Sequence, residues 1–272
     1  MKADSPGLSA SSASEERAKK AVKRRHDPAS LRRHLFVVGV GRSGTTVFAR
    51  ILNAHSQILV GIERYKYVAL GGLNDRSFGP ELFTRERFFD VRPGDTNVRQ
   101  RWTETQRDRW AGVKWVGDKI PHLYKRIDTI KRRFPGALVL CMLRDGLDVA
   151  SSWHTRAMKE TDSWPRHNDF VEGMRQWDEA NRGLLRDARL YRGTLYFVSY
   201  ESLFGPAQPD LTRLLDLLEV PADDGLLNEL SNQRAMTETR HQRRNHYKEL
   251  RSEAAIDVDE DCFAELMARS VV

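Results

Sequence analysis

The stretch LFVVGVGRSGTTVFARIL, residues 35–52, decides the fold of this 272-residue chain. Its first four residues are apolar and are soon followed by glycine, which predicts a short buried parallel strand over 35–38. A helix is predicted over 45–53, because its apolar side chains share one face: Val47, Phe48, Ile51 and Leu52. A strand, a glycine-bearing turn and a helix in this order direct backbone N–H groups towards an anion. The sequence therefore predicts an anion-binding loop at GVGRSGTT, residues 39–46.

The loop differs from a Walker A loop in its cation. Its spacing is G-x-x-x-x-G-T-T, whereas a Walker A loop reads G-x-x-x-x-G-K-[ST] and places its lysine on the terminal phosphates of a nucleoside triphosphate. Thr45 stands where that lysine would be, and a basic side chain, Arg42, stands inside the turn instead. A P-loop nucleotide kinase is therefore only an alternative function for this chain.

The rest of the chain alternates strands with helices. Further strands are predicted at 57–60, 113–116, 137–143 and 194–199. Helices are predicted at 121–133, up to about residue 158 after RDGLDVASSW, and at 169–191 and 211–218. This alternation predicts an α/β fold of three αβα layers with a central parallel sheet and a P-loop-like loop. Residues 62–112 have weaker periodicity and are expected to form a helical insertion that carries specificity.

Positive charge is concentrated at the N-terminus. Residues 1–34 contain nine Lys and Arg against four Asp and Glu, so +5 of the net charge of +7 belongs to this segment. We expect a basic, disordered arm over 1–33 and a single domain over 34–272. The arm either binds nucleic acid or another anionic surface, or is a solvated tail. Its composition favours the tail, so nucleic acid is not expected as a partner.

Composition restricts the class of protein further. The chain is 40% hydrophobic and 31% charged, which is typical of soluble globular proteins. It has no apolar run of the roughly 18 residues that a membrane span needs, and no apolar secretory segment at the N-terminus, so a cytoplasmic protein is expected. Neither Cys141 nor Cys262 is accompanied by a second ligand pair, so we expect no disulfide and no metal site.

Three segments follow predicted strands, where ligands bind in parallel sheets. They are GVGRSGTT at 39–46, GDKIP at 117–121 and LRDGLDVASSW at 143–153. Together they resemble the sulfotransferases that use 3′-phosphoadenosine 5′-phosphosulfate, nearest the branch of tyrosylprotein sulfotransferases and related bacterial enzymes. The resemblance covers roughly residues 35–204. It implies direct transfer of a sulfuryl group to a hydroxyl, with adenosine 3′,5′-bisphosphate as product and no metal.

The resemblance also implies two groups of nucleotide-binding residues. The first forms the phosphosulfate-binding loop: Arg42, Ser43, Gly44, Thr45 and Thr46. The second, Arg144 and Ser152, binds the 3′-phosphate. The residue types suit these roles, because a guanidinium is a planar fork for phosphate oxygens and a hydroxyl adds a neutral donor. A donor nucleotide without a γ-phosphate also explains why the loop has no Walker lysine.

Sulfuryl transfer needs a base for the acceptor hydroxyl and positive charge where the leaving phosphate becomes negative. By the resemblance Glu63, in LVGIERY, is the catalytic base, and burial beside Tyr65 and Tyr67 is expected to raise its pKa. The alternative is a surface glutamate that pairs with Arg64. Lys119, in GDKIP, is the corresponding catalytic cation, with a lysine on a solvated loop as the alternative.

Further residues are assigned to the site on the same resemblance. Arg42 counts as catalytic as well as nucleotide-binding, and His122 is an alternative base, as in the cytosolic small-molecule branch. Tyr200 either contacts the nucleotide or is a buried core tyrosine. Arg240 and Arg243, in the basic segment 237–248, are assigned to the 3′-phosphate, although the usual glycine pattern is absent and a solvated helix also fits. Five other residues of these segments are interpreted as structural: His55, Asp145, Asp148, Trp153 and Trp177.

The predicted function is transfer of a sulfuryl group to a hydroxyl of a glycan, a glycolipid or a small molecule, with a protein tyrosine less favoured. Residues 64–112, within the insertion 62–112, and the C-terminal segment are expected to select this acceptor. The alternatives are a P-loop nucleotide kinase and a nucleic-acid-binding protein that acts through its arm. The sequence leaves open whether the protein forms a homodimer.

Overall fold

The computed structural model describes residues 32–71, 77–98, 100–238, 251–252 and 256–272. Arg33–Val272 form one compact unit. Residues 1–31 of the basic arm lie outside the described residues, and so do Arg240 and Arg243. The expected disorder of the arm and the division of the chain into an arm and one domain therefore stay predictions.

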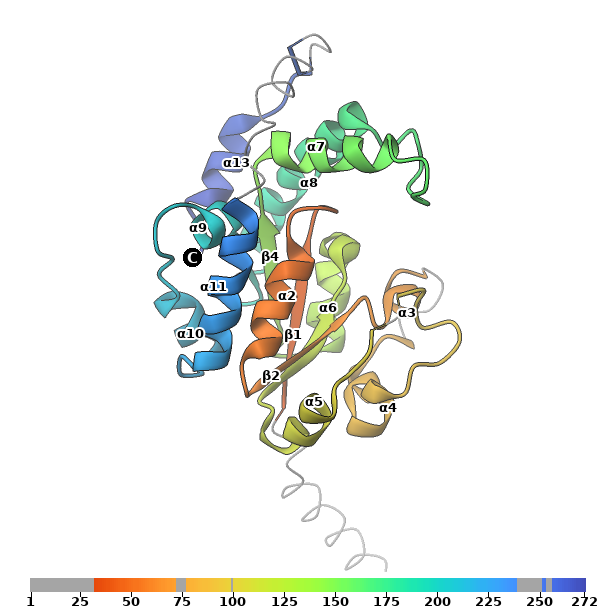
Figure 1. The fold of residues 1–272 in the computed structure, drawn as a ribbon, viewed down its shortest axis with the longest axis vertical. Helices are drawn as coiled ribbons and strands as arrows, with labels where there is room; N and C mark the ends of the chain where they lie inside the picture. The colour runs from red at the N-terminus through yellow and green to blue at the C-terminus, as the bar shows by residue number, and fades with distance from the viewer. Residues whose placement is uncertain (1–31, 72–76, 99, 239–250, 253–255) are drawn as a thin grey trace, which may run out of the picture. The chain divides into compact units, whose positions relative to one another are not determined.

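Within the described residues, five strands form one sheet in the order β2-β3-β1-β4-β5 (Figure 1). They are β1 (Arg33–Gly39), β2 (Ile58–Ile62), β3 (Trp115–Lys119), β4 (Leu138–Leu143) and β5 (Leu195–Ser199). All neighbouring pairs are parallel, and the central strand β1 pairs through Val37 with Lys119 on one side and Leu140 on the other. The carboxyl ends of all five strands therefore lie at one edge of the sheet.

Side chains of β1 alternate between two hydrophobic cores, as the two-residue period of a strand requires. Leu35 and Val37 belong to one core, and Phe36 and Val38 to the other. Helices that cover the first face are α2 (Thr45–Ala54), α9 (Tyr200–Phe204), α10 (Thr212–Leu218) and α11 (Asp224–Glu238). Helices that cover the second face are α6 (Ile127–Arg133), α7 (Gly146–Ala157), α8 (Phe170–Leu190) and α13 (Glu260–Met267). These layers confirm the predicted three-layer αβα fold.

Between β2 and β3, the residues that the structure describes form only short helices. They are α3 (Lys66–Leu70), a 3₁₀ turn (Pro80–Phe83), α4 (Arg85–Phe89), α5 (Glu104–Asp108) and a second 3₁₀ turn (Arg109–Gly112). Aromatic side chains fill its interior; the ring of Phe88 lies 4.9 Å from that of Trp102 and 5.6 Å from that of Trp110. Among the described residues, no helix combines the length and the apolar composition needed to cross a membrane.

The position of β3 differs from the prediction. The sequence predicts this strand at 113–116, but it begins at Trp115 and ends at Lys119. Val113 instead closes the preceding turn by donating to the carbonyl of Trp110, and the buried Trp115 indole donates to the carbonyl of Leu218 at 2.7 Å. The G-D-K part of GDKIP therefore lies in the strand, although the motif is expected to follow it.

His34 makes the stability of the fold depend on pH. Its ring packs against those of Phe83 and Phe134, at centroid distances of 5.5 and 5.0 Å. Burial lowers the pKa of His34 from 6.5 to about 4, so the folded chain keeps the imidazole neutral where the unfolded chain protonates it. The contribution of His34 to the free energy of unfolding should therefore fall by about 2 kcal/mol between pH values of about 8 and about 5. Urea unfolding of the wild type and of His34→Phe at both pH values isolates this contribution as the difference between the two proteins; the same pH dependence in both proteins would contradict the assignment.

Candidate active site

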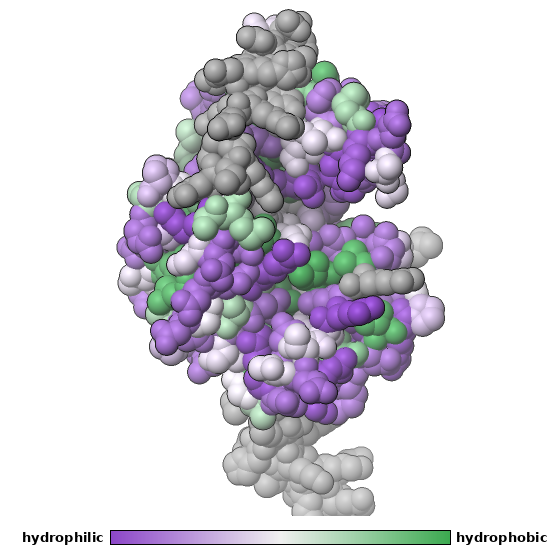
Figure 2. Space-filling model, in the orientation of Figure 1, coloured by the Kyte–Doolittle hydropathy of each residue, from purple (hydrophilic) through white to green (hydrophobic). Residues whose placement is uncertain are grey.

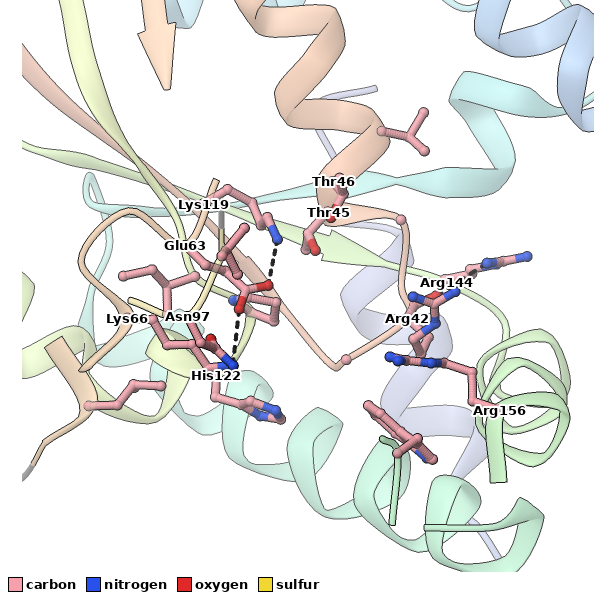
Figure 3. Close-up of a pocket in the computed structure, with 18 of the residues that line it drawn as sticks. Arg42, Thr45, Thr46, Glu63, Lys66, Asn97, Lys119, His122, Arg144 and Arg156 are labelled. Atoms are coloured by element: carbon pink, nitrogen blue, oxygen red, sulfur yellow. Dashed lines mark hydrogen bonds and ion pairs between the residues drawn. The ribbon is translucent and has the colours of Figure 1, made fainter. Parts of the chain in front are cut away.

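Strands that carry the three motifs lie side by side in the sheet. β1 leads into the loop 40–44, β3 ends at Lys119, and Arg144 follows β4. Glu63 and Tyr200 follow the flanking strands β2 and β5 and so reach the same edge. Residues of these five segments line a cavity of about 470 Å³ (Figure 3). In Figure 2 the surface is hollowed on the right, between the segment that follows α7 and the region of α3.

The loop between β1 and α2 leaves room for the close approach of a ligand. Gly44 has a φ of 95°, and a Cβ at this position would lie 2.5 Å from the Tyr200 ring, so only glycine fits. α2 begins at Thr45 without a side-chain cap and with no acidic residue in its first turn, so its first N–H groups stay available to an anion. Thr45 and Thr46 line the cavity. The Ser43 hydroxyl is buried and has no hydrogen-bond partner among the described residues.

Two arginines join this loop to β4 and α7. Arg42 Nε donates to Ser152 Oγ at 2.9 Å, and Arg144 Nη1 donates to the carbonyl of Arg42 at 3.2 Å. The Arg144 guanidinium lies over the Tyr200 ring, 4.1 Å from its centroid. Arg144 Nε is buried and without a hydrogen-bond partner in the described part of the chain. The structure therefore brings Arg42, Arg144 and Ser152 together, while Tyr200 is both a core residue and part of the cavity wall.

Two buried tryptophans hold these segments in place. The indole of Trp153 donates to the carbonyl of Gly41, and the indole of Trp177 donates to the carbonyl of Arg144, both at 2.8 Å. Both rings belong to the hydrophobic core, which confirms their structural interpretation. Asp145 is likewise structural, because its side chain caps the N-terminus of α7.

At the opposite wall of the cavity a carboxylate lies between two ammonium groups (Figure 3). Lys119 Nζ donates to Glu63 Oε1 at 2.9 Å, and Lys66 Nζ lies 3.2 Å from Glu63 Oε2. The Lys119 side chain is 1% exposed and that of Glu63 is 19% exposed. Lys119 is therefore no solvated loop residue, and the strand end holds its ammonium group against the carboxylate.

The pKa of Glu63 is lowered, although the sequence predicts that it is raised. Burial does raise this pKa, but the charges and hydrogen bonds of Lys119 and Lys66 outweigh the effect of burial. The alternative pairing of Glu63 with Arg64 is also wrong, because the Arg64 side chain is buried and bonds to Asp95 at 2.7 Å. Glu63 is therefore ionised at neutral pH.

The two histidines near the motifs lie in different surroundings. His122 lines the cavity in the 3₁₀ segment Pro121–Arg126, and burial, with a smaller contribution from Lys125, lowers its pKa. Its imidazole is therefore neutral at pH 7 and able to accept a proton. His55 ends α2 as its C-cap, and its Nε2 lies 2.8 Å from the carbonyl of Pro221, which confirms its structural interpretation.

The cavity also contains residues that the motifs do not predict. Lys66 and Asn97 lie on the side of Glu63, and Arg156 extends from α7 beside Arg42 (Figure 3). The guanidinium of Arg156 is 4.6 Å from the ring of Trp164. Arg156 stands four residues after Ser152, a spacing that places both on one helix face and is readable from the sequence. Asn97 and Trp164 come from irregular segments, where no periodic signal exists.

The assignment of Arg240 and Arg243 to the 3′-phosphate stays a prediction, because both lie outside the described residues. Within the part of the chain that the structure describes, no group of three or more His, Cys, Asp and Glu is placed to hold a metal ion.

Fold and cavity together define an α/β protein in which a strand–loop–helix unit, two arginines and a Glu–Lys pair share one cavity. A family model described as the sulfotransferase family matches residues 34–224, well over half of the chain. The chain belongs to the sulfotransferase family.

Individual relatives are distant. Protein-tyrosine sulfotransferase A of Caenorhabditis elegans is 26% identical over a match of 223 residues, and the match covers 71% of this chain and 52% of the nematode protein. An uncharacterised protein of Aquifex aeolicus is 25% identical over a match of 214 residues, and the match covers 72% of this chain and 26% of that protein. The chain therefore spans about half the length of the first relative and about a quarter of the second.

Solved structures that are similar to this chain include two sulfotransferases. The sulfotransferase domain from the Synechococcus PCC 7002 olefin synthase is 19% identical, with a TM-score of 0.47 and coverage of 73% of this chain and 77% of that one. The sulfotransferase from Alicyclobacillus acidocaldarius is 18% identical, with a TM-score of 0.45 and coverage of 80% and 99%.

Proposed function

We propose that this chain transfers a sulfuryl group from 3′-phosphoadenosine 5′-phosphosulfate to a hydroxyl of a glycan, a glycolipid or a small molecule. The observation that carries the proposal is the contact of Glu63 with Lys119 at 2.9 Å, inside the cavity that Arg42 and Gly44 of the loop and Arg144 also line. The residues of the insertion that line this cavity, Lys66 and Asn97 among them, are proposed to contact the acceptor. Because the nematode relative is named for protein tyrosine, a tyrosine hydroxyl belongs among the acceptors to be assayed.

The residues present fit a nucleotide with two separated anionic ends. Ser43 Oγ and Arg144 Nε are buried polar atoms without hydrogen-bond partners among the described residues, which is unfavourable unless a ligand supplies them. The uncapped N-terminus of α2 likewise favours an anion. Arg42, Ser43 and the N-terminus of α2 would hold the 5′-phosphosulfate, and Arg144 and Ser152 would hold the 3′-phosphate. This division needs no divalent cation.

Two residues in contact at one wall of the cavity, Lys119 and Glu63, share the proposed chemistry. When bound, the co-substrate supplies a sulfuryl group attached to an anionic leaving group. Lys119 is desolvated and stabilises the negative charge that develops on the leaving oxygen. Glu63 is ionised at neutral pH and accepts the proton of the acceptor hydroxyl. A Lys119 ammonium group drawn towards the leaving oxygen would stabilise Glu63 less, which would make Glu63 a stronger base.

Thermal unfolding with adenosine 3′,5′-bisphosphate, ATP with Mg²⁺, or NAD tests the proposal. A ligand present at about 100 times its Kd stabilises the folded chain by about 2.7 kcal/mol, which raises Tm by roughly 5–10 °C for a domain of this size. We expect such a shift for the bisphosphate, unchanged by EDTA. A shift with ATP and Mg²⁺ and none with the bisphosphate would favour the P-loop nucleotide kinase instead.

Arg144→Ala should raise the Kd of adenosine 3′,5′-bisphosphate roughly 10- to 100-fold, because it removes charge-assisted hydrogen bonds to the 3′-phosphate. Titration calorimetry measures this change directly. Arg101→Ala removes an exposed arginine that does not line the cavity and should leave the Kd unchanged. An unchanged Kd in Arg144→Ala would remove this residue from the phosphate site.

The cytoplasmic location, the role of the basic arm and a homodimer stay predictions. Deletion of residues 1–33 separates the two interpretations of the arm. Sulfuryl transfer should survive the deletion if the arm is a solvated tail, whereas a salt-sensitive affinity for nucleic acid should disappear if the arm binds it.

A further inference from the structure

The turn that carries Glu63 is held by the last two residues of β3. Three consecutive backbone N–H groups donate to this strand end. The N–H of Glu63 bonds to the carbonyl of Lys119 at 2.8 Å. The next two bond to the carboxylate of Asp118, from Arg64 at 3.0 Å and from Tyr65 at 2.8 Å. One fully buried carboxylate therefore accepts both N–H groups that follow Glu63.

These bonds hold a backbone conformation that a glutamate does not favour. Glu63 has a φ of 54°, in the left-handed region. This region costs a residue other than glycine on the order of 1 kcal/mol or more. The two carboxylate–amide bonds are charge-assisted and offset that cost. Gly61 leaves the space for them, because a Cβ there would lie 2.7 Å from both Asp118 Oδ1 and Arg64 Cβ.

The same strand end places both members of the Glu–Lys pair. Lys119 supplies the ammonium group that contacts Glu63 Oε1, and Asp118 fixes the backbone from which Glu63 extends. Neighbouring side chains of a strand point to opposite faces, so the two residues reach the turn from different sides. The distance between base and cation is therefore set by one strand rather than by two independent loops.

We propose that Asp118 is a positioning residue, which holds Glu63 where its carboxylate meets both Lys119 and the acceptor hydroxyl. The inference rests on the proposed function of Glu63 as base. Complete burial raises the pKa of Asp118 to about 7, against the hydrogen bonds from Arg64 and Tyr65 and the charges of Lys119 and Arg64, which lower it. Assays at about pH 8 therefore examine the carboxylate form.

Asp118→Asn keeps the shape of the side chain but turns an NH₂ group towards one of the two N–H donors. The turn then shifts, and a displacement of about 1 Å can cost a factor on the order of 100 in rate. We expect kcat to fall roughly 10- to 100-fold while the Kd of adenosine 3′,5′-bisphosphate changes less than about twofold.

A double-mutant cycle with Glu63→Gln distinguishes positioning from general stability. If Asp118 acts through Glu63, adding Asp118→Asn to Glu63→Gln should cost less than about a factor of three. The matched control is Glu201→Gln, which alters another largely buried carboxylate that accepts a backbone N–H, from Asp145 at 2.8 Å. Its effect on kcat should be equal with and without Glu63→Gln.

Gly61→Ala provides a second variant, which adds a Cβ 2.7 Å from both Asp118 Oδ1 and Arg64 Cβ and so disturbs the contact between the carboxylate and the turn without changing any charge. It should give the same fall in kcat with an unchanged Kd, and it decides the question if Asp118→Asn does not fold. Wild-type kcat in the folded variants, or a loss that adds in full to that of Glu63→Gln, would overturn the role of Asp118. A wild-type chain that fails to bind the bisphosphate would instead contradict the proposed function itself.

Discussion

Glu63→Gln is expected to lower kcat by roughly 10²- to 10⁴-fold, the range for loss of a positioned general base. Glutamine keeps the length of the side chain but cannot accept the proton of the acceptor hydroxyl. Arg42 and Arg144 lie across the cavity from Glu63, so the Kd of the bisphosphate should stay nearly unchanged. Single-turnover kinetics with a saturating donor nucleotide measure the loss.

Glu104→Gln is the matched control, since Glu104 is exposed in α5 and does not line the cavity. It should retain wild-type kcat. A fully active Glu63→Gln would exclude Glu63 as base and move that role to His122, the neutral imidazole in the same cavity. His122→Asn would then show the loss instead.

Lys119→Met should lower kcat by roughly 10²- to 10³-fold, the cost of removing one preorganised donor from a developing negative charge. The effect is large because the ammonium group is desolvated, where electrostatic interactions are stronger than in water. Removal of this charge also raises the pKa of Glu63. The carboxylate is then a stronger base, which should offset part of the loss in kcat. A pH profile of kcat for both proteins shows whether the acid limb moves to higher pH.

Lys114→Met supplies the comparison for that substitution. Lys114 lies just before β3 and pairs with the exposed Glu219 at 3.0 Å, away from the cavity. A surface pair of this kind contributes at most about 1 kcal/mol to stability, so kcat should not change. Equal losses of kcat in Lys119→Met and Lys114→Met would show that any removed positive charge lowers the rate. The effect of Lys119 would then not depend on its contact with the reacting groups.

Local patterns in the chain are sufficient for the fold and for most of the cavity wall. The apolar run before GVGRSGTT and the helical period after it predict β1 and α2, because strand and helix periods are properties of a few consecutive residues. The carboxyl ends of parallel strands lie at one edge of the sheet. The three motifs are therefore expected at the same edge, whatever the order of the strands. The adjacency of β3, β1 and β4 then brings Lys119, the loop 40–44 and Arg144 together.

The electrostatic state of the site depends on contacts that no local pattern contains. Glu63 and Lys119 are 56 residues apart, and only the pairing of β2 with β3 makes them neighbours. Their contact, with that of Lys66, reverses the expected sign of the Glu63 pKa shift, since the attraction of two nearby cations outweighs the desolvation of one carboxylate. Burial of Arg64 against Asp95 and the two hydrogen bonds of Asp118 arise in the same way. The charge state of the site and the strain of its backbone depend on groups from distant segments. They are therefore decided by packing and not by the local sequence.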